Sequence, residues 1–212
     1  MIPLVSGLTA SALHVVSGPD HLAAVTPLAI ESKNRSWAIG MVWGIGHIMG
    51  VLIIGGLFML FRELIPVEAI SQYSEQIVGV VLIIIGLWAL YNIYRGEHHN
   101  HEAKHTHHHA SSIMKRNMLT SVSVGVIHGL AGVSHIIAII PALALPTAFD
   151  AAMYIAGFSI GTISAMMVYS AILGMIAQRS FITNKIKFFK GFRLTGSIFT
   201  IIVGIGWIAQ NI

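Results

Sequence analysis

Long runs of sequence without a charged side chain are the feature that most limits how this chain can fold. Uncharged segments cover residues 1–19, 21–30, 36–61, 76–94, 117–149, 151–178 and 194–212. A helix that spans a bilayer needs about 20 mostly apolar residues. Only Asp20 separates the first two segments, so we join them. We therefore expect an all-α integral membrane protein with six spans, at roughly 3–30, 37–61, 75–94, 117–145, 150–178 and 192–211.

The composition supports the membrane interpretation and excludes several other classes. Hydrophobic residues make up 55% of the chain and charged residues 9%, whereas soluble domains carry about 25% charged residues. A soluble enzyme, a disordered tail and a nucleic-acid-binding protein are therefore excluded as leading interpretations. Cysteine is absent, so the chain has no disulfide, no thiolate metal site and no thiol relay.

The basic residues predict the orientation of the spans. With six spans, 11 of the 12 Lys and Arg residues fall in the connections on one side of the membrane, and only Arg62 falls on the other. Cytoplasmic connections carry the excess of Lys and Arg. We therefore expect an inner (cell) membrane protein with both termini outside and residues 95–116 in the cytoplasm. The net charge of +4 then reflects topology and indicates no nucleic-acid partner.

The two halves of the chain share a pattern. His14, Gly18, His21, Ala24 and Pro27 recur 114 residues later, in the second half, as His128, Gly132, His135, Ala138 and Pro141. Each half has three spans, so the second half must enter the membrane upside down relative to the first. We predict a 3+3 inverted repeat, with residues 1–94 as the first three-helix repeat, 95–116 as a His-rich loop and 117–212 as the second repeat. Transporters with such repeats bind their substrate near the midplane, where broken helices meet.

The sequence also predicts where the first and fourth spans break. Pro19 lacks an N–H and clashes with the carbonyl four residues before it in a continuous helix. Glycines lie at the corresponding depth of the fourth span. The expected breaks are at Ser17, Gly18 and Pro19 in the first span and at Gly129 and Gly132 in the fourth.

One acid and five histidines lie inside the spans and are the expected metal site. Asp20 is the single formally charged side chain away from the ends of the six spans, and its burial costs at least ~2.5–3.5 kcal/mol on insertion scales. Imidazoles with one carboxylate suit borderline divalent cations. The candidate ligands are His14, Asp20, His21, His47, His128 and His135. In a continuous helix, His14 and His21 would be ~10 Å apart along the axis, so either the break folds them towards one ion or the two repeats supply the steps of a relay.

The segment 97–109 is rich in histidine, which is a compositional signal of metal binding. Its members are His98, His99, His101, His105, His107, His108 and His109. Flexible ligands of this kind suit the capture of a metal ion on the cytoplasmic side, and we expect this loop to act as an auxiliary capture site.

The run HVVSGPDHLAAVTP at residues 14–27 resembles the NicO/UreH-like branch of the nickel/cobalt transporter superfamily, the branch of the urease accessory proteins. The resemblance implies movement of transition-metal ions, most often nickel or cobalt, with His14, Asp20 and His21 matching the motif. The better-known permeases have four residues between the histidine and the aspartate, whereas this chain has five. Related 3+3 proteins carry electrons through paired cysteines, which this chain lacks.

The leading hypothesis from the sequence is a secondary transporter of Ni²⁺ or Co²⁺, with Zn²⁺ or Fe²⁺ as other ions for the same donors, and with uptake favoured over efflux. Two alternatives stay open: an accessory protein that delivers metal for urease or hydrogenase maturation, and a proton-coupled exporter of a small anion or amino acid. We expect no enzymatic activity, because the interiors of the spans hold neither a Glu nor a His-Glu-x-x-His motif. We expect no prosthetic group. The expected partners are the metal ion and the lipid bilayer, with a cytoplasmic metallochaperone or a second copy of the chain as further partners.

Overall fold

The protein is a bundle of helices throughout the part of the chain that the computed structural model describes, which is residues 1–61, 67–98, 107–131, 140–183 and 185–210. These residues contain no strand, so the prediction of an all-helical protein is confirmed for them. The helices are α1 (Ile2–Ser17), α2 (Pro19–Ser32), the short 3-10 helix η1 (Lys33–Arg35), α3 (Ser36–Phe61), α4 (Val67–His98), α5 (His107–Leu130), α7 (Ala148–Ile182) and α8 (Ile186–Gln210).

Four of the described helical stretches are long and apolar enough to cross a membrane. They cover Pro19–Leu57, Glu75–Arg95, Ala148–Ile182 and Ile186–Gln210, and α1 is a shorter apolar helix. Large apolar side chains such as Ile84, Leu87 and Ile202 are exposed on the outside of the bundle, at 59%, 54% and 62%. Apolar surface of this extent suits contact with lipid rather than water. The chain is therefore a membrane protein.

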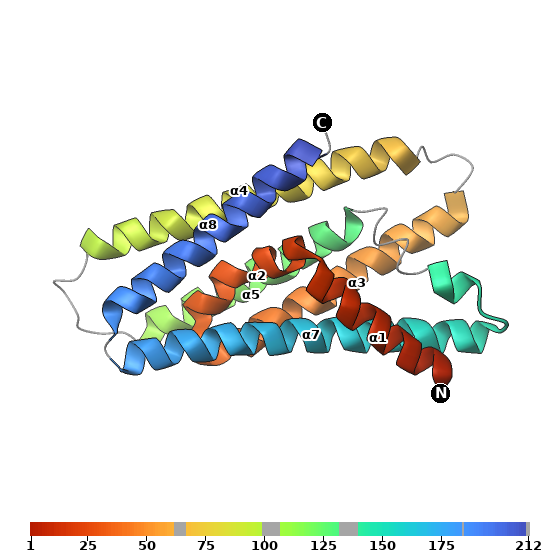
Figure 1. Ribbon diagram of the computed structural model, residues 1–212, viewed down its shortest axis with the longest axis horizontal. Helices are drawn as coiled ribbons and strands as arrows, with labels where there is room; N and C mark the ends of the chain where they lie inside the picture. Colours follow the sequence, from red (N-terminus) through yellow and green to blue (C-terminus); the bar gives the residue numbers. More distant parts are fainter. Residues whose placement is uncertain (62–66, 99–106, 132–139, 184, 211–212) are drawn as a thin grey trace.

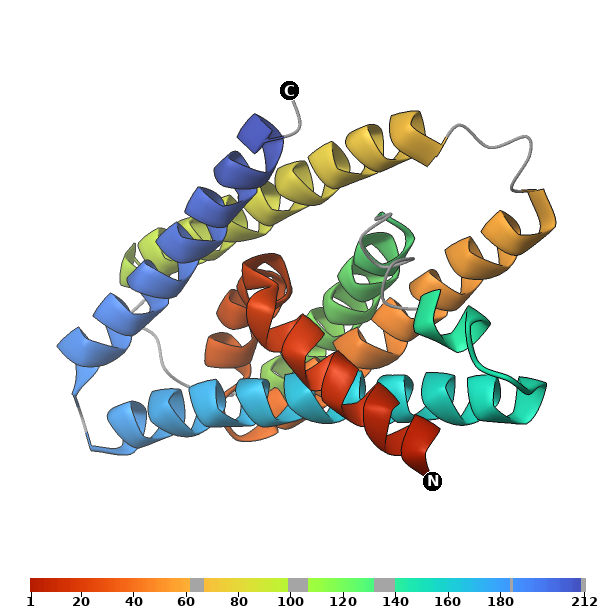
Figure 2. The same cartoon turned by 45° about the vertical axis from the view of Figure 1, so that its right-hand side comes forward.

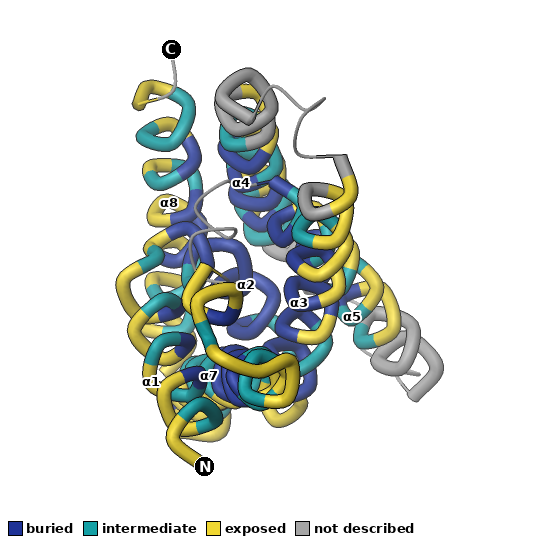
Figure 3. Tube along the Cα trace, turned by 90° about the vertical axis from the view of Figure 1, so that its right-hand side faces the viewer, coloured by how far each residue is buried: buried dark blue, intermediate teal, exposed yellow. Residues whose placement is uncertain are grey.

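Helix α2 forms the centre of the bundle. Ten of its 14 residues are buried, and it contacts α3, α7 and α8. Around it, α1 packs against α7, α4 packs against α8, and α3 contacts both α5 and α7; Figures 1 and 2 show the α4–α8 pair on one side and α7 on the other. Figure 3 shows the buried tube of α2 enclosed by helices whose outer turns are exposed.

The first predicted span consists of two helices, and the break between them lies where the sequence predicted it. Helix α1 ends at Ser17 and α2 begins at Pro19, and the residue between them, Gly18, has an extended backbone with φ −92° and ψ 94°. Pro19 fits the first position of α2, where its missing N–H costs no helical hydrogen bond. The turn of η1 then brings the chain back, so that α3 runs alongside α2 (Figure 1).

In the second half, α5 ends at Leu130, one residue after the predicted break at Gly129. Gly129 also serves close packing, since a Cβ atom there would collide with the carbonyl oxygen of His47. The segment predicted as the loop 95–116 is shorter than expected, because α4 continues to His98 and α5 begins at His107. Gly132 lies outside the described residues.

Candidate metal centre

The break between α1 and α2 brings two histidines into contact. The N–H of Gly18 donates a hydrogen bond of 3.1 Å to the carbonyl of His14, which closes α1, and the chain bends before α2 begins. The Nε2 atoms of His14 and His21 are then 3.1 Å apart. Seven residues of continuous helix would have kept these residues ~10 Å apart along the axis. The bend at Gly18 therefore brings His14 and His21 together, which was the first of the two alternatives that the sequence left open for this pair.

Asp20 joins histidines from both halves of the chain. Its side chain is buried, with 4% of the residue exposed. One carboxylate oxygen lies 3.0 Å from Nδ1 of His21, and the other lies 3.1 Å from Nε2 of His128 on α5. Asp20 also occupies the first turn of α2, where the partial positive charge of the helix N-terminus stabilises a carboxylate. These two contacts and the helix N-terminus explain how the acid is accommodated among apolar helices.

Helix α3 adds a further imidazole to this cluster. His47 is fully buried, and its ring centroid lies 5.1 Å from that of His21 and 5.6 Å from that of His128. Among the described residues, two groups of three each bring together one ligand atom per residue, and within a group these atoms lie within 4.8 Å of one another. The groups are His14, His21 and His47, and Asp20, His21 and His128. His21 belongs to both groups. We call the five residues together the histidine cluster.

Small residues in α3 and α5 allow His47 and His128 to approach. A Cβ atom on Gly46 of α3 would collide with the carbonyl oxygen of Val122, and one on Gly125 of α5 would collide with that of Trp43. Backbones that come this close need glycine at the crossing, which is the usual way in which helices associate in membranes. The glycines therefore determine the separation of the two helices that carry these histidines.

The histidine cluster is flanked by two aromatic residues, Trp43 and Phe158, which were not among the predicted site residues. Trp43 stacks on His47 with ring centroids 4.9 Å apart and planes 9° apart. Phe158 of α7 lies 5.7 Å from the ring of His14. The sequence carried a signal for each of them. Trp43 precedes His47 by one helical turn, and Phe158 follows Trp43 by 115 residues, the separation that also relates Gly46 to Gly161.

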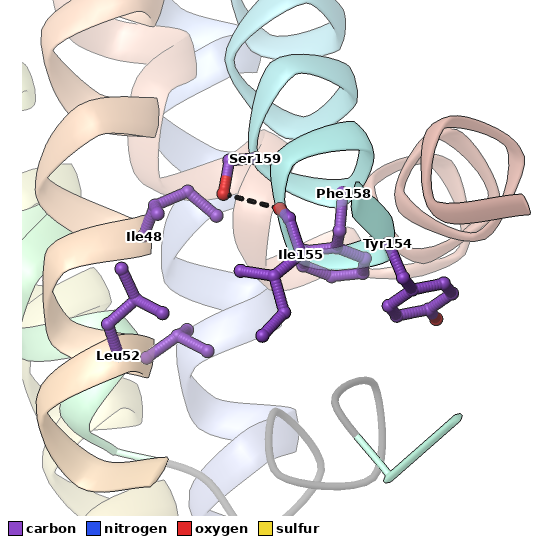
Figure 4. Close-up of a pocket in the computed structure, with 7 residues that line it drawn as sticks. Ile48, Leu52, Tyr154, Ile155, Phe158 and Ser159 are labelled. Atoms are coloured by element: carbon purple, nitrogen blue, oxygen red, sulfur yellow. Dashed lines mark hydrogen bonds between the residues drawn. The ribbon is translucent and has the colours of Figure 1, made fainter. Parts of the chain in front are cut away.

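A small apolar cavity lies beside the cluster, between α3 and α7 (Figure 4). Ile48 and Leu52 of α3 face Ile155 and Phe158 of α7 across it. Its volume is about 10 Å³, which is near the minimum needed for one water molecule. The Ser159 hydroxyl donates a 2.8 Å hydrogen bond to the carbonyl of Ile155 and so turns back onto its own helix. This side of the cluster is thus closed by apolar side chains.

The remaining predicted site residues are not brought into the cluster by the described structure. His135 lies outside the described residues, as do His99, His101 and His105 of the histidine-rich segment. His98 is the last residue of α4, and His107, His108 and His109 form the start of α5. The structure says nothing further about the side chains of this segment.

The donor set fits a divalent transition-metal ion. Donors held about 2.1 Å from one ion lie roughly 3.0–3.4 Å apart, and the Nε2 atoms of His14 and His21 are 3.1 Å apart. A neutral His21 that donates from Nδ1 to Asp20 leaves the lone pair of Nε2 available for an ion. A carboxylate behind an imidazole is the usual way in which proteins orient a metal-binding histidine.

Comparison with known proteins places the chain among membrane proteins. The family model described as "Cytochrome C biogenesis protein transmembrane region" matches residues 4–206. The chain is 34% identical over 182 residues to Chloroplast protein FOR GROWTH AND FERTILITY 1, and 33% identical over 185 residues to FOR GROWTH AND FERTILITY 2, both of Arabidopsis thaliana. These alignments cover 82% of this chain but only 50% and 47% of the two plant proteins, so the chain spans about half of their length.

A bacterial relative matches over most of its own length. Urease accessory protein UreH of Bacillus sp. (strain TB-90) is 31% identical over 188 residues, which are 86% of this chain and 81% of UreH. No solved structure matches the chain. The similarity to UreH agrees with the urease accessory branch expected from the sequence, while membership of the nickel/cobalt transporter superfamily stays a prediction. The chain belongs to the family of cytochrome c biogenesis protein transmembrane regions and is a relative of the urease accessory protein UreH.

Proposed function

We propose that this protein is a secondary transporter that moves a divalent transition-metal ion, Ni²⁺ or Co²⁺, across the membrane through the histidine cluster. The observation that carries the proposal is the pair of three-residue donor groups that share His21 among apolar helices. Imidazole and carboxylate donors without a thiolate favour ions of this class, and Zn²⁺ and Fe²⁺ are accepted by the same donors. We assign the chain no enzymatic role.

The ion would pass between the two donor groups by way of His21. The Nε2 atom of His21 faces His14, and its Nδ1 atom faces Asp20. An imidazole has one nitrogen on each side of its ring, so this residue can serve each donor group in turn. The ion would exchange its waters for His14, His21 and His47, with His21 bound through Nε2, and then transfer to Asp20, His21 and His128. In the second step His21 would exchange the proton on Nδ1 for one on Nε2, so that Nδ1 is free to bind the ion. The two alternatives for these histidines are thereby combined: several of them share one ion at a time, and the ion is passed from the first donor group to the second.

Opening of the cluster would follow from motion of two inverted repeats against each other. The packing supports this part of the proposal, because α1 against α7 is the counterpart of α5 against α3. Gly46 packs on the carbonyl of Val122, and Gly161 packs on that of Leu8. Leu8 and Val122 are 114 residues apart, the same separation as His14 and His128. Two crossings built from corresponding residues are what a 3+3 repeat requires.

The proposed orientation places both termini outside an inner (cell) membrane and the histidine-rich segment in the cytoplasm. A dication that moves inward gains about 4.6 kcal/mol per 100 mV, twice the value for a single charge. Uptake therefore needs no other source of energy, and we propose this direction. The histidine-rich segment would receive the imported ion and pass it to a cytoplasmic metallochaperone.

Flux into liposomes tests the proposal. The parent for this test is a loop-silent variant of the full chain, in which the seven histidines of the histidine-rich segment are replaced by Gln: His98, His99, His101, His105, His107, His108 and His109. It is reconstituted in vesicles that enclose a nickel-sensitive dye. The loop-silent parent should carry Ni²⁺ inward when the vesicle interior is negative, and His21→Gln should lower the initial rate at least 10-fold. The control is Ser197→Ala, which removes a buried hydroxyl that bonds to the Arg193 carbonyl of its own helix. Equal rates in His21→Gln and the control would reject the cluster as the pathway.

A second function, delivery of metal to an enzyme under maturation without transport, is favoured by the similarity to UreH. The same vesicles distinguish the two functions. Stoichiometric nickel binding by the loop-silent parent, without entry of the ion into the vesicle, would support delivery and exclude transport. Transport of an anion or amino acid that is insensitive to nickel would instead support the proton-coupled exporter.

A further inference from the structure

A cleft between α3 and α5 combines an apolar wall with a basic mouth. Its volume is about 530 Å³. Both basic residues of its lining lie towards the N-terminal side of the apolar wall: Arg35 directly precedes α3, and Lys115 is the ninth residue of α5. The wall is lined by Val42 and Ile45 of α3 and by Leu119 and Val122 of α5. Ile45 and Leu119 are 40% and 66% exposed, so the wall faces outward from the bundle.

The two helices run in the same direction along this cleft. Their contacts advance together, because Gly46 packs on Val122 and Gly50 packs on Val126. The apolar wall therefore extends away from the basic mouth along both helices. From Arg35 to Ile45 the chain advances ten residues, about 15 Å of helix. That length is half of the ~30 Å hydrocarbon core of a bilayer, so the wall has the depth of one leaflet.

No salt bridge joins Arg35 or Lys115 to an acidic group among the side chains that the structure describes. The salt bridges found there join Asp20 to His21 and to His128. Basic residues at the membrane surface, between helices, are typical of sites for anionic lipid headgroups. A phosphate at the mouth would provide the missing negative charge, and an acyl chain would cover the apolar wall.

We propose that this cleft is a binding site for an anionic phospholipid. The headgroup phosphate lies between Arg35 and Lys115, and one acyl chain lies along α3 and α5. Val122 lines the cleft and also receives Gly46 at the crossing of the two helices. The bound lipid therefore contacts the same seam that brings His47 next to His128, and it stabilises that seam without contributing a metal ligand.

Native mass spectrometry of the full chain in neutral detergent tests this site. The probe is dioleoylphosphatidylglycerol, and dioleoylphosphatidylcholine and inorganic phosphate are the comparison ligands. We expect bound phosphatidylglycerol, little phosphatidylcholine and no displacement of the lipid by millimolar phosphate. The double variant Arg35→Gln/Lys115→Gln should weaken phosphatidylglycerol binding by about 25-fold, since each basic side chain at the surface contributes about fivefold.

The matched control removes two charges from another cleft with basic residues. Arg179 and Lys185 line a smaller cleft of about 260 Å³ on α7 and the turn before α8, and the control is Arg179→Gln/Lys185→Gln. Retention of the lipid in this control supports the proposed site, whereas an equal loss in both double variants shows non-specific attraction and overturns it. Displacement by inorganic phosphate would show a phosphate site without a lipid tail and would also overturn it. A dimer that excludes lipid would show that a second copy covers the wall.

A second variant tests the apolar wall without changing charge. Leu119→Trp fills the cleft from an exposed position and should reduce binding of the two-chain lipid while nickel binding at the histidine cluster is retained. Unchanged lipid binding in this variant would place the acyl chain elsewhere and overturn the proposal. Because nickel binding is measured separately, failure of the lipid site and failure of the proposed transport function can be told apart.

Discussion

A methyl group added at Gly18 should disturb the metal site without changing the fold. The backbone of Gly18 has φ −92° and ψ 94°, values that residues with a side chain adopt without strain. Gly18→Ala should therefore keep the break between α1 and α2. The added Cβ atom would nevertheless collide with Nδ1 of His21 and lie 2.9 Å from Oδ1 of Asp20 and from Cε1 of His21.

The size of the effect follows from these contacts. Carbon contacts are optimal at about 3.5–4.0 Å, so the imidazole and the carboxylate must move by roughly 0.5–1 Å. Metal sites tolerate errors of only about 0.2 Å in ligand distance. Loss of an orienting partner of a metal-binding histidine typically lowers affinity 10- to 100-fold, equivalent to about 1.4–2.7 kcal/mol. We expect a loss of this size for Ni²⁺, without a change in helix content.

The assay is calorimetric titration of Ni²⁺ into the loop-silent variant in detergent, with and without Gly18→Ala. The matched control is Gly206→Ala in α8, where a Cβ atom meets nothing within 4 Å. The control should bind Ni²⁺ as the parent does. A dissociation constant for Gly18→Ala within twofold of the parent would refute the assignment of His21 and Asp20 to the metal site.

Three further predictions concern the packing and the pH dependence. The hydroxyls of Thr26 and Tyr169 are 2.7 Å apart, so Thr26→Val should lower the free energy of unfolding by about 1 kcal/mol; a double-mutant cycle with Tyr169→Phe in a thermal melt should show coupling, and additive losses would contradict it. The ammonium of Lys33 lies 3.4 Å from the ring centroid of Phe181, so Lys33→Gln should cost about 0.5–2 kcal/mol in the same assay, and an unchanged melting temperature would exclude this contribution. Metal binds to neutral imidazole, so protons compete with it, and nickel affinity of the loop-silent variant should fall steadily from pH 7.5 to pH 5.5; a pH-independent affinity would argue against histidine ligands.

The helical part of this architecture could be predicted from the sequence with good accuracy. The expected span 37–61 corresponds to α3 at Ser36–Phe61, and the expected span 150–178 lies within α7 at Ala148–Ile182. Charged residues are costly in lipid, so they mark the ends of such segments directly. At the membrane surface the helices extend beyond the uncharged runs, because a charged side chain in water does not end a helix. Helix α4, for example, continues to His98.

Gly129, one residue before the end of α5, shows what the sequence leaves open about a glycine in a membrane helix. A glycine in a membrane helix either breaks it or permits a close approach, and its sequence neighbours do not distinguish the two. At Gly18 the chain breaks before Pro19, although Pro27 stays inside the continuous helix α2, whereas at Gly129 the approaching backbone of α3 provides the reason for the missing side chain. The partner helix is remote in sequence, so this distinction depends on packing.

By itself, the sequence determined that this chain consists of apolar helices, that one of them is interrupted at Pro19, and that an acid and several histidines lie within them. These properties depend on local chemistry: the cost of charge in lipid and the missing N–H of proline. Only the tertiary structure decided that His21 is shared by two donor groups, that His47 and His128 meet beside it, and that Trp43 and Phe158 border the cluster. These contacts depend on the angle of the bend at Gly18 and on the close crossing of α3 and α5, which arise from packing between segments far apart in the chain.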